Sequence, residues 1–246
     1  MSEQNAKVAI VTGASRGIGA AVAERLARDG FSVIVNYSGS VEAADALVRK
    51  IQEGGGRALA VKADVSDTRA VREMFETTVS KFDGVDVLVN NAGIMTQSNI
   101  ADTDDASFDK QIAINLKGTF NALREGAKRL RNGGRIINFS SSVVGLLQPT
   151  YAVYAGTKAA VEAMTSVLAK ELRGRNITVN AIAPGPTATD LFLKGKPQAL
   201  IDHLTKLAPL ERLGQPDDIA RAVSFLAGPD GAWINGQVLR ANGGII

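Results

Sequence analysis

The feature that most limits the fold of this chain is a regular alternation between short β-branched runs and longer stretches of helical pattern. The β-branched runs are KVAIV (7–11), SVIVNY (32–37), LAVKAD (59–64), VDVLVN (85–90), RIINFS (135–140), ITVNAIA (177–183) and QVLRA (237–241). Continuous apolar strands separated by helices are typical of a parallel sheet that is covered on both faces. Because crossovers between parallel strands are right-handed, we predict an α/β fold with one doubly wound sheet of about seven strands.

Helical patterns fill the intervals between the first strands, at 20–30, 42–56 and 68–84. They end at Gly30, Gly54 and Gly84, where we expect left-handed C-terminal caps. No Pro- or Ser-rich linker interrupts the chain, so we predict a single domain over residues 1–246. In such folds ligands bind at the carboxyl ends of the strands, near the point where the strand order reverses.

Composition excludes several classes of function. The chain has no cysteine and one histidine, His203, which leaves no residues for a thiolate metal site and argues against a histidine triad. Aromatic residues are 5% of the chain and the net charge of +3 is not clustered, so we expect no nucleic-acid partner. No apolar run is long enough for a membrane span and no signal segment is recognisable. We predict a cytoplasmic protein without a metal site or a membrane partner.

Directly after the first predicted strand comes TGASRGIG, residues 12–19. Its glycines, Gly13, Gly17 and Gly19, allow a sharp turn and a close approach of phosphate to the start of a helix, where unpaired amides favour negative charge. The spacing differs from G-x-G-x-x-G, and a tight strand-to-helix turn is the alternative interpretation. Its place after the first strand favours phosphate binding.

The end of the second predicted strand indicates which dinucleotide would bind. An NAD site usually has an acidic residue here for the ribose 2′-hydroxyl, but this chain has the uncharged Asn36, Tyr37 and Ser38. Arg16 lies in the glycine loop, and a cation beside neutral donors suits a 2′-phosphate. We therefore predict NADP, with NAD as the less favoured cofactor.

Within VYAGTK (153–158), Tyr154 and Lys158 lie one helical turn apart and should share one helix face. By itself, this pair is more typical of an ordinary surface helix. Together, however, the motifs TGASRGIG, ADV, NNAG, IINFSSS, YAGTK and PGPTATD resemble those of the short-chain dehydrogenase/reductase family, over essentially the whole chain. Within that family the sequence is most similar to bacterial 3-oxoacyl-acyl-carrier-protein reductases. The resemblance implies a Rossmann-like fold.

The resemblance also implies the catalytic roles. Tyr154 would donate a proton to the carbonyl oxygen, and Lys158 would hold the ribose hydroxyls and lower the pKa of the tyrosine. Asn115 would support a water in a proton relay. Ser141 would orient the substrate oxygen, because the family serine lies 13 residues before the tyrosine, although Ser142 fits the local motif and stays open.

The cofactor-binding residues that we predict come from the glycine loop, from the ends of later strands and from the catalytic pair. They are Gly13, Ser15, Arg16, Gly17, Ile18, Gly19, Asn36, Tyr37, Ser38, Ala63, Asp64, Val65, Asn91, Ala92, Gly93, Tyr154, Lys158, Pro184, Gly185, Thr187 and Thr189. Asp64 would accept from the adenine amino group. Thr189 would bond the nicotinamide carboxamide, and Thr187 would contribute mainly its backbone.

The predicted activity is NADP(H)-dependent reduction of a carbonyl to a secondary alcohol, with a 3-oxoacyl thioester carried on acyl carrier protein or coenzyme A as the leading substrate. Arg131 and Arg175 lie where related enzymes meet the carrier protein. The alternatives are a reductase or dehydrogenase of another small ketone, alcohol or sugar, and a cofactor-binding scaffold or sensor. Residues 187–210, with His203 among them, would form a lid over the substrate. The small residues around Tyr154, with the resemblance, imply a homotetramer.

Overall fold

A computed structural model describes residues 6–246 and confirms the predicted sheet. Seven strands, all parallel, form one Rossmann-like sheet in the order β3-β2-β1-β4-β5-β6-β7. The strands are β1 (Val8–Val11), β2 (Ser32–Tyr37), β3 (Arg57–Lys62), β4 (Val85–Asn90), β5 (Leu130–Phe139), β6 (Thr178–Pro184) and β7 (Val238–Ala241). The order reverses between β1 and β4, so a ligand crevice is expected at their carboxyl ends.

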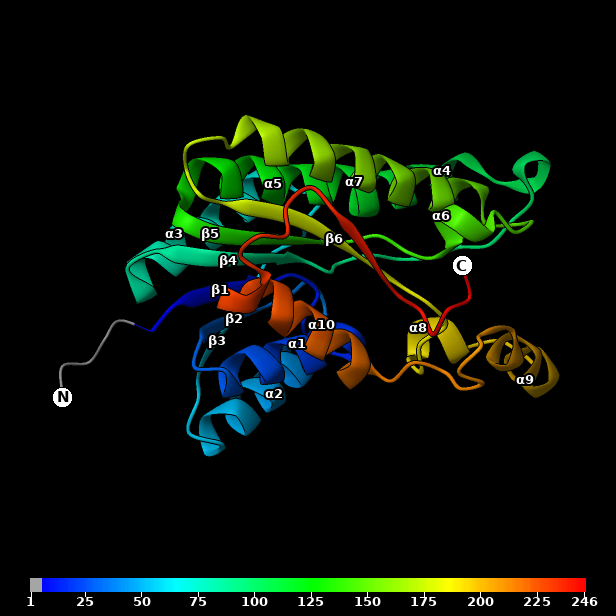
Figure 1. Ribbon diagram of the computed structural model, residues 1–246, viewed down its shortest axis with the longest axis horizontal. Coiled ribbons are helices and arrows are strands. Elements are labelled where there is room, and N and C mark those ends of the chain that lie inside the picture. The colour runs from blue at the N-terminus through cyan, green and yellow to red at the C-terminus, as the bar shows by residue number, and fades with distance from the viewer. Residues whose placement is uncertain (1–5) are drawn as a thin grey trace.

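Helices cover both faces of this sheet (Figure 1). The helices are α1 (Gly17–Arg28), α2 (Val41–Glu53), α3 (Thr68–Phe82), α4 (Asp105–Gln111), a π-helix (Ile112–Lys117), α5 (Gly118–Arg129), α6 (Val143–Leu146), α7 (Ala152–Glu171), α8 (Asp190–Leu193), α9 (Gln198–Leu207) and α10 (Pro216–Ala227). Helices α3, α5 and α7 form one layer, and α1, α2 and α10 form the other.

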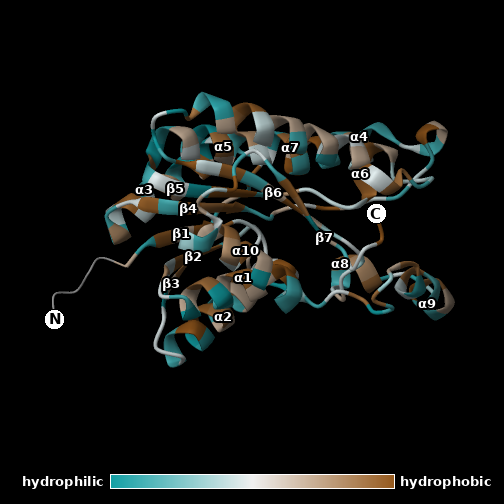
Figure 2. Cartoon of the chain, in the orientation of Figure 1, coloured by the Kyte–Doolittle hydropathy of each residue, from teal (hydrophilic) through white to brown (hydrophobic). Residues whose placement is uncertain are grey.

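Alternate residues of each central strand belong to opposite cores. Ile10 packs with α3, α5 and α7, whereas its neighbours Ala9 and Val11 pack with α1, α2 and α10. This is why the strand sequences are apolar throughout rather than alternating. In Figure 2 apolar residues colour much of the central strands brown, and teal residues lie mainly on the outer elements.

Several element boundaries differ from the sequence prediction. Strand β5 begins at Leu130 rather than Arg135, because Leu130 also pairs with β4 and a register shift between Val85 and Val87 accommodates the residues between. Helix α1 begins inside the glycine loop, at Gly17. Strand β3 runs from Arg57 to Lys62 and is therefore shifted by two residues from the predicted 59–64.

The predicted glycine caps are confirmed in part. Gly30 has a positive φ of 92°, but the left-handed C-cap of α3 is Asp83, at 63°, rather than Gly84, and Gly54 has a φ of −77°. The left-handed turn after α2 falls instead on Gly55, at 81°, one residue later than predicted, because Gly54 is the C-cap and keeps a negative φ. Among residues 6–246, the structure contains no helix with the length and apolar character to cross a lipid bilayer.

Candidate active site

Two adjoining cavities open at the carboxyl ends of the strands. The larger has a volume of about 580 Å³ and the smaller about 160 Å³. Residues that line both cavities are Ile18, Asn91, Gly93, Thr189 and Leu191. The larger cavity is bounded by the glycine loop and the ends of β2, β3 and β4, and the smaller one by the end of β5, by α7 and by residues 184–192.

The glycine loop brings free helix amides to the larger cavity. The N–H of Ala20 donates to the carbonyl of Arg16 at 3.2 Å, so the amides of Gly17, Ile18 and Gly19 lie ahead of that bond at the helix N-terminus. Gly13 has a φ of 62°, and a Cβ there would come within 2.9 Å of the Ala92 backbone. This position therefore requires glycine for two independent reasons.

Asn36 lines the larger cavity, and its side chain also forms hydrogen bonds within the protein. Its side chain is 1% exposed, and its Oδ1 accepts from the N–H of Gly13 at 3.1 Å. Its Nδ2 donates to the carbonyls of Val61 and Ala63 at 3.3 and 3.0 Å. Because these bonds use the amide within the protein, Asn36 holds the glycine loop against β3, and the polar groups left for a ligand come from neighbouring residues.

Those neighbours fit a phosphorylated dinucleotide. Arg16 and Ser38 are exposed and line the larger cavity together with Tyr37, and no carboxylate stands at the end of β2. Asp64 is exposed in the same cavity, where its Oδ1 accepts from Ser66 at 2.7 Å. A helix N-terminus, a cation and a cavity of this volume are together suited to a pyrophosphate with an added 2′-phosphate.

Asn91, Ala92 and Gly93 also line the larger cavity, as predicted. Asn91 Nδ2 donates to the carbonyls of Thr12 and Gly13 at 2.9 and 3.0 Å, which fixes the end of β4 to the end of β1. Ala63 and Val65 are buried at the end of β3, where they also contribute to the wall.

Tyr154 and Lys158 project from α7 into the smaller cavity, as the spacing predicted. The Lys158 Nζ lies 5.7 Å from the centroid of the Tyr154 ring. Lys158 is 4% exposed, and its Nζ donates to the carbonyl of Phe139, the last residue of β5, at 2.8 Å. This buried cation is therefore fixed by one backbone acceptor and keeps further N–H groups for a ligand.

Burial shifts the pKa values of this pair in opposite directions. It lowers the pKa of Lys158 to about 8. It raises the pKa of Tyr154 to about 12, an effect that a hydrogen bond with Ser141 opposes and the nearby Tyr151 phenol increases. The expected lowering of the Tyr154 pKa is thus not produced by the protein's own groups. It would need an additional positive charge in the cavity.

The three consecutive serines after β5 have separate partners. Ser140 donates to Glu162 Oε1 at 2.5 Å, and Ser142 donates to the carbonyl of Ala183 at 3.3 Å. Ser141 Oγ accepts from the N–H of Val143 at 3.3 Å, and its influence on Tyr154 opposes the rise in the pKa of that phenol. Both Ser141 and Ser142 line the smaller cavity, but the Ser142 hydroxyl is used within the protein, which favours Ser141 as the serine that meets a substrate.

Asn115 lies in the π-helix and is fully buried. Its Oδ1 accepts from the N–H of Ile94 at 2.8 Å and its Nδ2 donates to the carbonyl of the same residue at 2.9 Å. A Cβ on Gly93 would lie 3.3 Å from Asn115 Oδ1 and 3.6 Å from Lys158 Nζ. The side chain thus holds the loop after β4 close to the buried ammonium.

Residues 184–189 begin with the last residue of β6, and members of this segment line both cavities. Pro184, Gly185 and Thr187 border the smaller one, and Thr189 borders both. Thr187 is 4% exposed and donates its hydroxyl to the carbonyl of Gly185 at 2.9 Å, so its side chain is used within the protein.

The predicted lid segment contains α8 and α9. Leu191, Phe192 and Leu204 from this segment line the smaller cavity, whereas none of the residues of α9 is fully buried. His203 is exposed and does not line either cavity.

Further walls of the smaller cavity are Met95, Leu146, Gln148 and Tyr151, which lie in the segments 94–101 and 146–153 where the sequence places substrate choice. Ile245 also lines this cavity, and the sequence analysis missed it. Tyr151 accepts from Gln97 Nε2 at 2.6 Å, and burial raises its pKa. Ile245 lies about 90 residues after the 146–151 stretch, so no local pattern could have grouped it with the other walls.

Replacing Lys158 by Met should raise the free energy of unfolding at about pH 7. The shift from 10.5 to about 8 means that the charged form costs about 3 kcal/mol in the folded state, more than the ~1 kcal/mol of its hydrogen bond. We expect a gain of about 2 kcal/mol, measured by urea unfolding without cofactor.

This gain should depend on pH. Between about 8 and 10.5 the unfolded state binds more protons than the folded state, so the penalty on wild-type Lys158 is complete below this range and is relieved as the pH rises through it. The advantage of Lys158→Met should therefore shrink at about pH 9.5. The control is Lys170→Met, on the exposed end of the same helix. Equal stability of wild type and Lys158→Met at about pH 7 would contradict the conclusion that burial of the charged Lys158 destabilises the folded protein.

Comparison with known proteins agrees with this geometry. A family model described as "Enoyl-(Acyl carrier protein) reductase" matches residues 13–246. A "Short-chain type dehydrogenase/reductase" of Picea abies is 45% identical, over 97% of this chain and 92% of its own. An "NADPH-dependent aldehyde reductase-like protein, chloroplastic" of Arabidopsis thaliana is 42% identical, over 98% of this chain and 94% of its own.

A solved structure is similar over the same extent. The crystal structure of a short-chain dehydrogenase from Burkholderia cenocepacia, in complex with NADP, superposes with a TM-score of 0.92 at 38% identity and covers 97% of both chains. These matches each cover 95% or more of the chain. The chain belongs to the short-chain dehydrogenase/reductase family of oxidoreductases.

Proposed function

We propose that the protein is an NADPH-dependent carbonyl reductase that converts a ketone or aldehyde to the alcohol. The observation that carries this proposal is the meeting of Ser141, Tyr154 and Lys158 in one small, mainly apolar cavity that adjoins the larger polar one. A substrate in the smaller cavity would lie next to the nicotinamide end of a dinucleotide in the larger cavity.

The cofactor preference rests on the end of β2. Arg16 is exposed at the rim of the larger cavity, beside Tyr37 and Ser38, and no acidic side chain there would repel a 2′-phosphate. The NADPH dependence in the name of the Arabidopsis relative and the NADP complex of the Burkholderia structure support the same choice. The amides of Gly17, Ile18 and Gly19 would hold the pyrophosphate.

When bound, NADPH supplies the hydride that goes to the carbonyl carbon. Tyr154 would donate its phenolic proton to the carbonyl oxygen, and Ser141 would hold that oxygen and stabilise the charge that develops on it. Lys158 would bind the ribose hydroxyls with the N–H groups that Phe139 does not use. Asn115 would position a water that returns a proton from solvent toward Lys158.

For the substrate, we propose a compact apolar carbonyl compound. The smaller cavity is lined by Met95, Leu146, Leu191, Phe192 and Ile245, and an acyl chain of a 3-oxoacyl thioester would suit this lining. The protein surface around the site decides between an acyl group carried on acyl carrier protein or coenzyme A and a free ketone.

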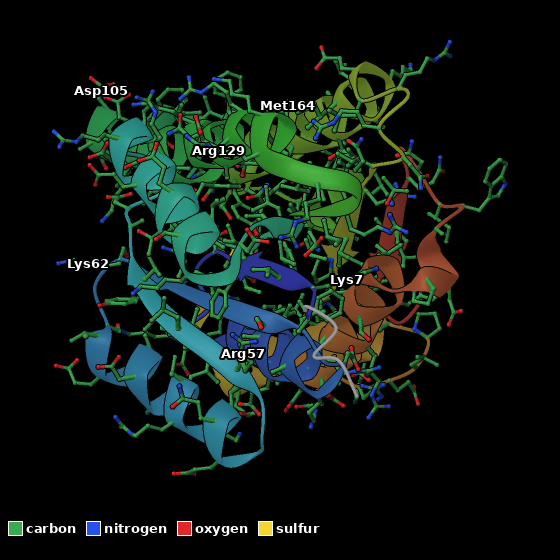
Figure 3. The ribbon with its side chains drawn as sticks, turned by 90° about the vertical axis from the view of Figure 1, so that its left-hand side faces the viewer. Lys7, Arg57, Lys62, Asp105, Arg129 and Met164 are labelled. Carbon is green, nitrogen blue, oxygen red and sulfur yellow. The ribbon has the colours of Figure 1, made fainter. Side chains whose placement is uncertain are left out.

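A specific observation favours a free ketone or aldehyde over a carrier-bound substrate. Arg175 donates to the carbonyls of Ala127 and Leu130, and Arg131 pairs with Asp83 and Asp86. Arg131 lies at the start of β5, and Arg175 lies three residues before β6. Both arginines are therefore at the amino end of the sheet, the end that faces the viewer in Figure 3. Their guanidinium groups are used within this chain instead of being free for an acidic carrier protein.

We also propose that the chain assembles as a homotetramer through α5 and α7. The outward stripe of α7 consists of small, exposed residues, Ala152, Gly156, Ala159 and Ala163, and Phe120 of α5 is 48% exposed. Such a face lets a second helix approach closely.

Gly156→Leu should lower the particle mass measured by light scattering, because the added side chain points into open space in the monomer and would block the approaching helix. Ala46→Leu, exposed on α2, is the matched control. If the Gly156→Leu variant has the wild-type particle mass, this face of α7 is not the subunit interface.

Tyr154→Phe should lower kcat by at least about 100-fold, because it removes the proton donor and nothing else. Oxidation of NADPH and of NADH would be followed with 3-oxoacyl thioesters and a panel of free ketones and aldehydes, and NADPH binding by its fluorescence. We expect turnover with NADPH in preference to NADH and an unchanged NADPH Kd in the variant. Equal turnover in the variant would refute the role of the phenol.

A further inference from the structure

The last five residues of the sequence, Asn242–Ile246, lie against the active site although no motif identifies them. They follow β7, whose last residue pairs with Pro184 at the carboxyl end of β6. Figure 1 shows this segment in red between α6 and α8, and Figure 2 shows its end as hydrophobic. We refer to residues 242–246 as the terminal segment.

One end of the terminal segment holds the three serines that follow β5, residues 140–142, which we call the serine loop. Asn242 Nδ2 donates to Ser142 Oγ at 3.0 Å. Ser142 is 2% exposed, and its N–H and hydroxyl donate to the carbonyls of Pro184 and Ala183 at 2.9 and 3.3 Å. Asn242 therefore completes the set of bonds that fix the residue next to Ser141 in the chain.

The middle of the terminal segment holds the chain that leaves the lid. The N–H of Leu210, three residues after α9, donates to the carbonyl of Gly243 at 3.3 Å. A Cβ on Gly244 would lie 3.2 Å from the Pro209 ring. Asn242 also stabilises this turn, because its Oδ1 accepts from the N–H of Gly244 at 3.0 Å.

The far end of the terminal segment reaches the substrate. Ile245 lines the smaller cavity with Tyr154, Leu146 and Leu204. Ile246 packs its side chain over Gly145 of α6, where the absence of a Cβ provides the room. Both chain neighbours of Ile245 therefore anchor it to the cavity wall, because Gly244 packs against Pro209 and Ile246 packs over Gly145.

We propose that the terminal segment is the specificity element of this enzyme: Ile245 limits the bulk of the carbonyl substrate, and Asn242 is a positioning residue that fixes both the segment and the serine loop. This proposal rests on the proposed carbonyl reductase function. The terminal segment contacts the serine loop, the residues Pro209 and Leu210 that follow α9, and the wall of the smaller cavity. Displacement of this segment would therefore change substrate preference without altering the larger, dinucleotide cavity.

The first test measures the effect of Ile245→Ala on substrate size. In a cavity of about 160 Å³, loss of three side-chain carbons should reduce contact with a small ketone and admit a larger one. Since each missing methylene in an apolar pocket changes discrimination by 10-fold or more, we expect the ratio of kcat/KM for a branched aryl ketone to that for a small alkyl ketone to rise at least about 10-fold.

Controls separate the possible outcomes of this test. Ile100→Ala, 79% exposed and outside both cavities, should leave the ratio unchanged. NADPH Kd, measured by fluorescence, should be the same in all variants. Turnover by Ile245→Ala with the wild-type size ranking would overturn the proposal alone. Failure of the wild type to reduce any carbonyl compound would overturn the proposed function as well.

The second test measures coupling between Asn242 and Ser142. We expect Asn242→Ala and Ser142→Ala each to lower kcat about 10-fold, with KM and NADPH Kd little changed, because the serine loop loses the same bond in both. The double variant should then be no slower than either single variant. Additive losses, or an unchanged kcat in Asn242→Ala, would refute the positioning role.

Discussion

The site depends on one buried cation. Lys158 is carried by α7 to the carboxyl end of β5, where the Phe139 carbonyl is its only hydrogen-bond partner among the described residues. Burial of an ammonium with one neutral acceptor is unfavourable, and the lowered pKa of Lys158 expresses that cost. The cost is tolerated because two large apolar cores, one on each face of the sheet, stabilise the elements that hold the side chain.

Three amide side chains around the two cavities form hydrogen bonds within the protein. Asn36 holds the glycine loop, Asn91 joins β1 to β4, and Asn115 fixes the loop after β4. Asn36 and Asn115 are buried and Asn91 is partly buried, and the hydrogen bonds of these amides make their loops rigid. The groups that remain for ligands include helix amides, Arg16, Ser38, Ser141, Tyr154 and the unused N–H groups of Lys158. Rigid amides therefore define where a cofactor and a carbonyl could meet.

The sequence predicted the sheet, the two helical layers and the family, because strand composition, helix period and the glycine loop are local patterns. Spacing along α7 also predicted that Tyr154 and Lys158 share a face. The sequence could not reveal the hydrogen bonds of Asn36 to Gly13 and to the end of β3, because these bonds depend on how three separated segments pack. Nor could it find Ile245, which reaches the cavity only because β7 lies beside β6. The lowered pKa of Tyr154 was predicted for a site that also holds an oxidised nicotinamide ring and stays a prediction, since burial raises this pKa in the protein alone.

The central claim is that the protein's own groups keep the Tyr154 phenol neutral and that a bound pyridinium charge makes it acidic. The most direct measurement is the ultraviolet difference spectrum of tyrosinate, wild type minus Tyr154→Phe, titrated with and without NADP⁺. Without the nucleotide, Tyr154 should show no ionisation until well above its ordinary pKa of 10, in keeping with a value of about 12. With NADP⁺ the midpoint should fall by more than about one unit. An ordinary midpoint without NADP⁺, or the same midpoint in both titrations, would contradict the account.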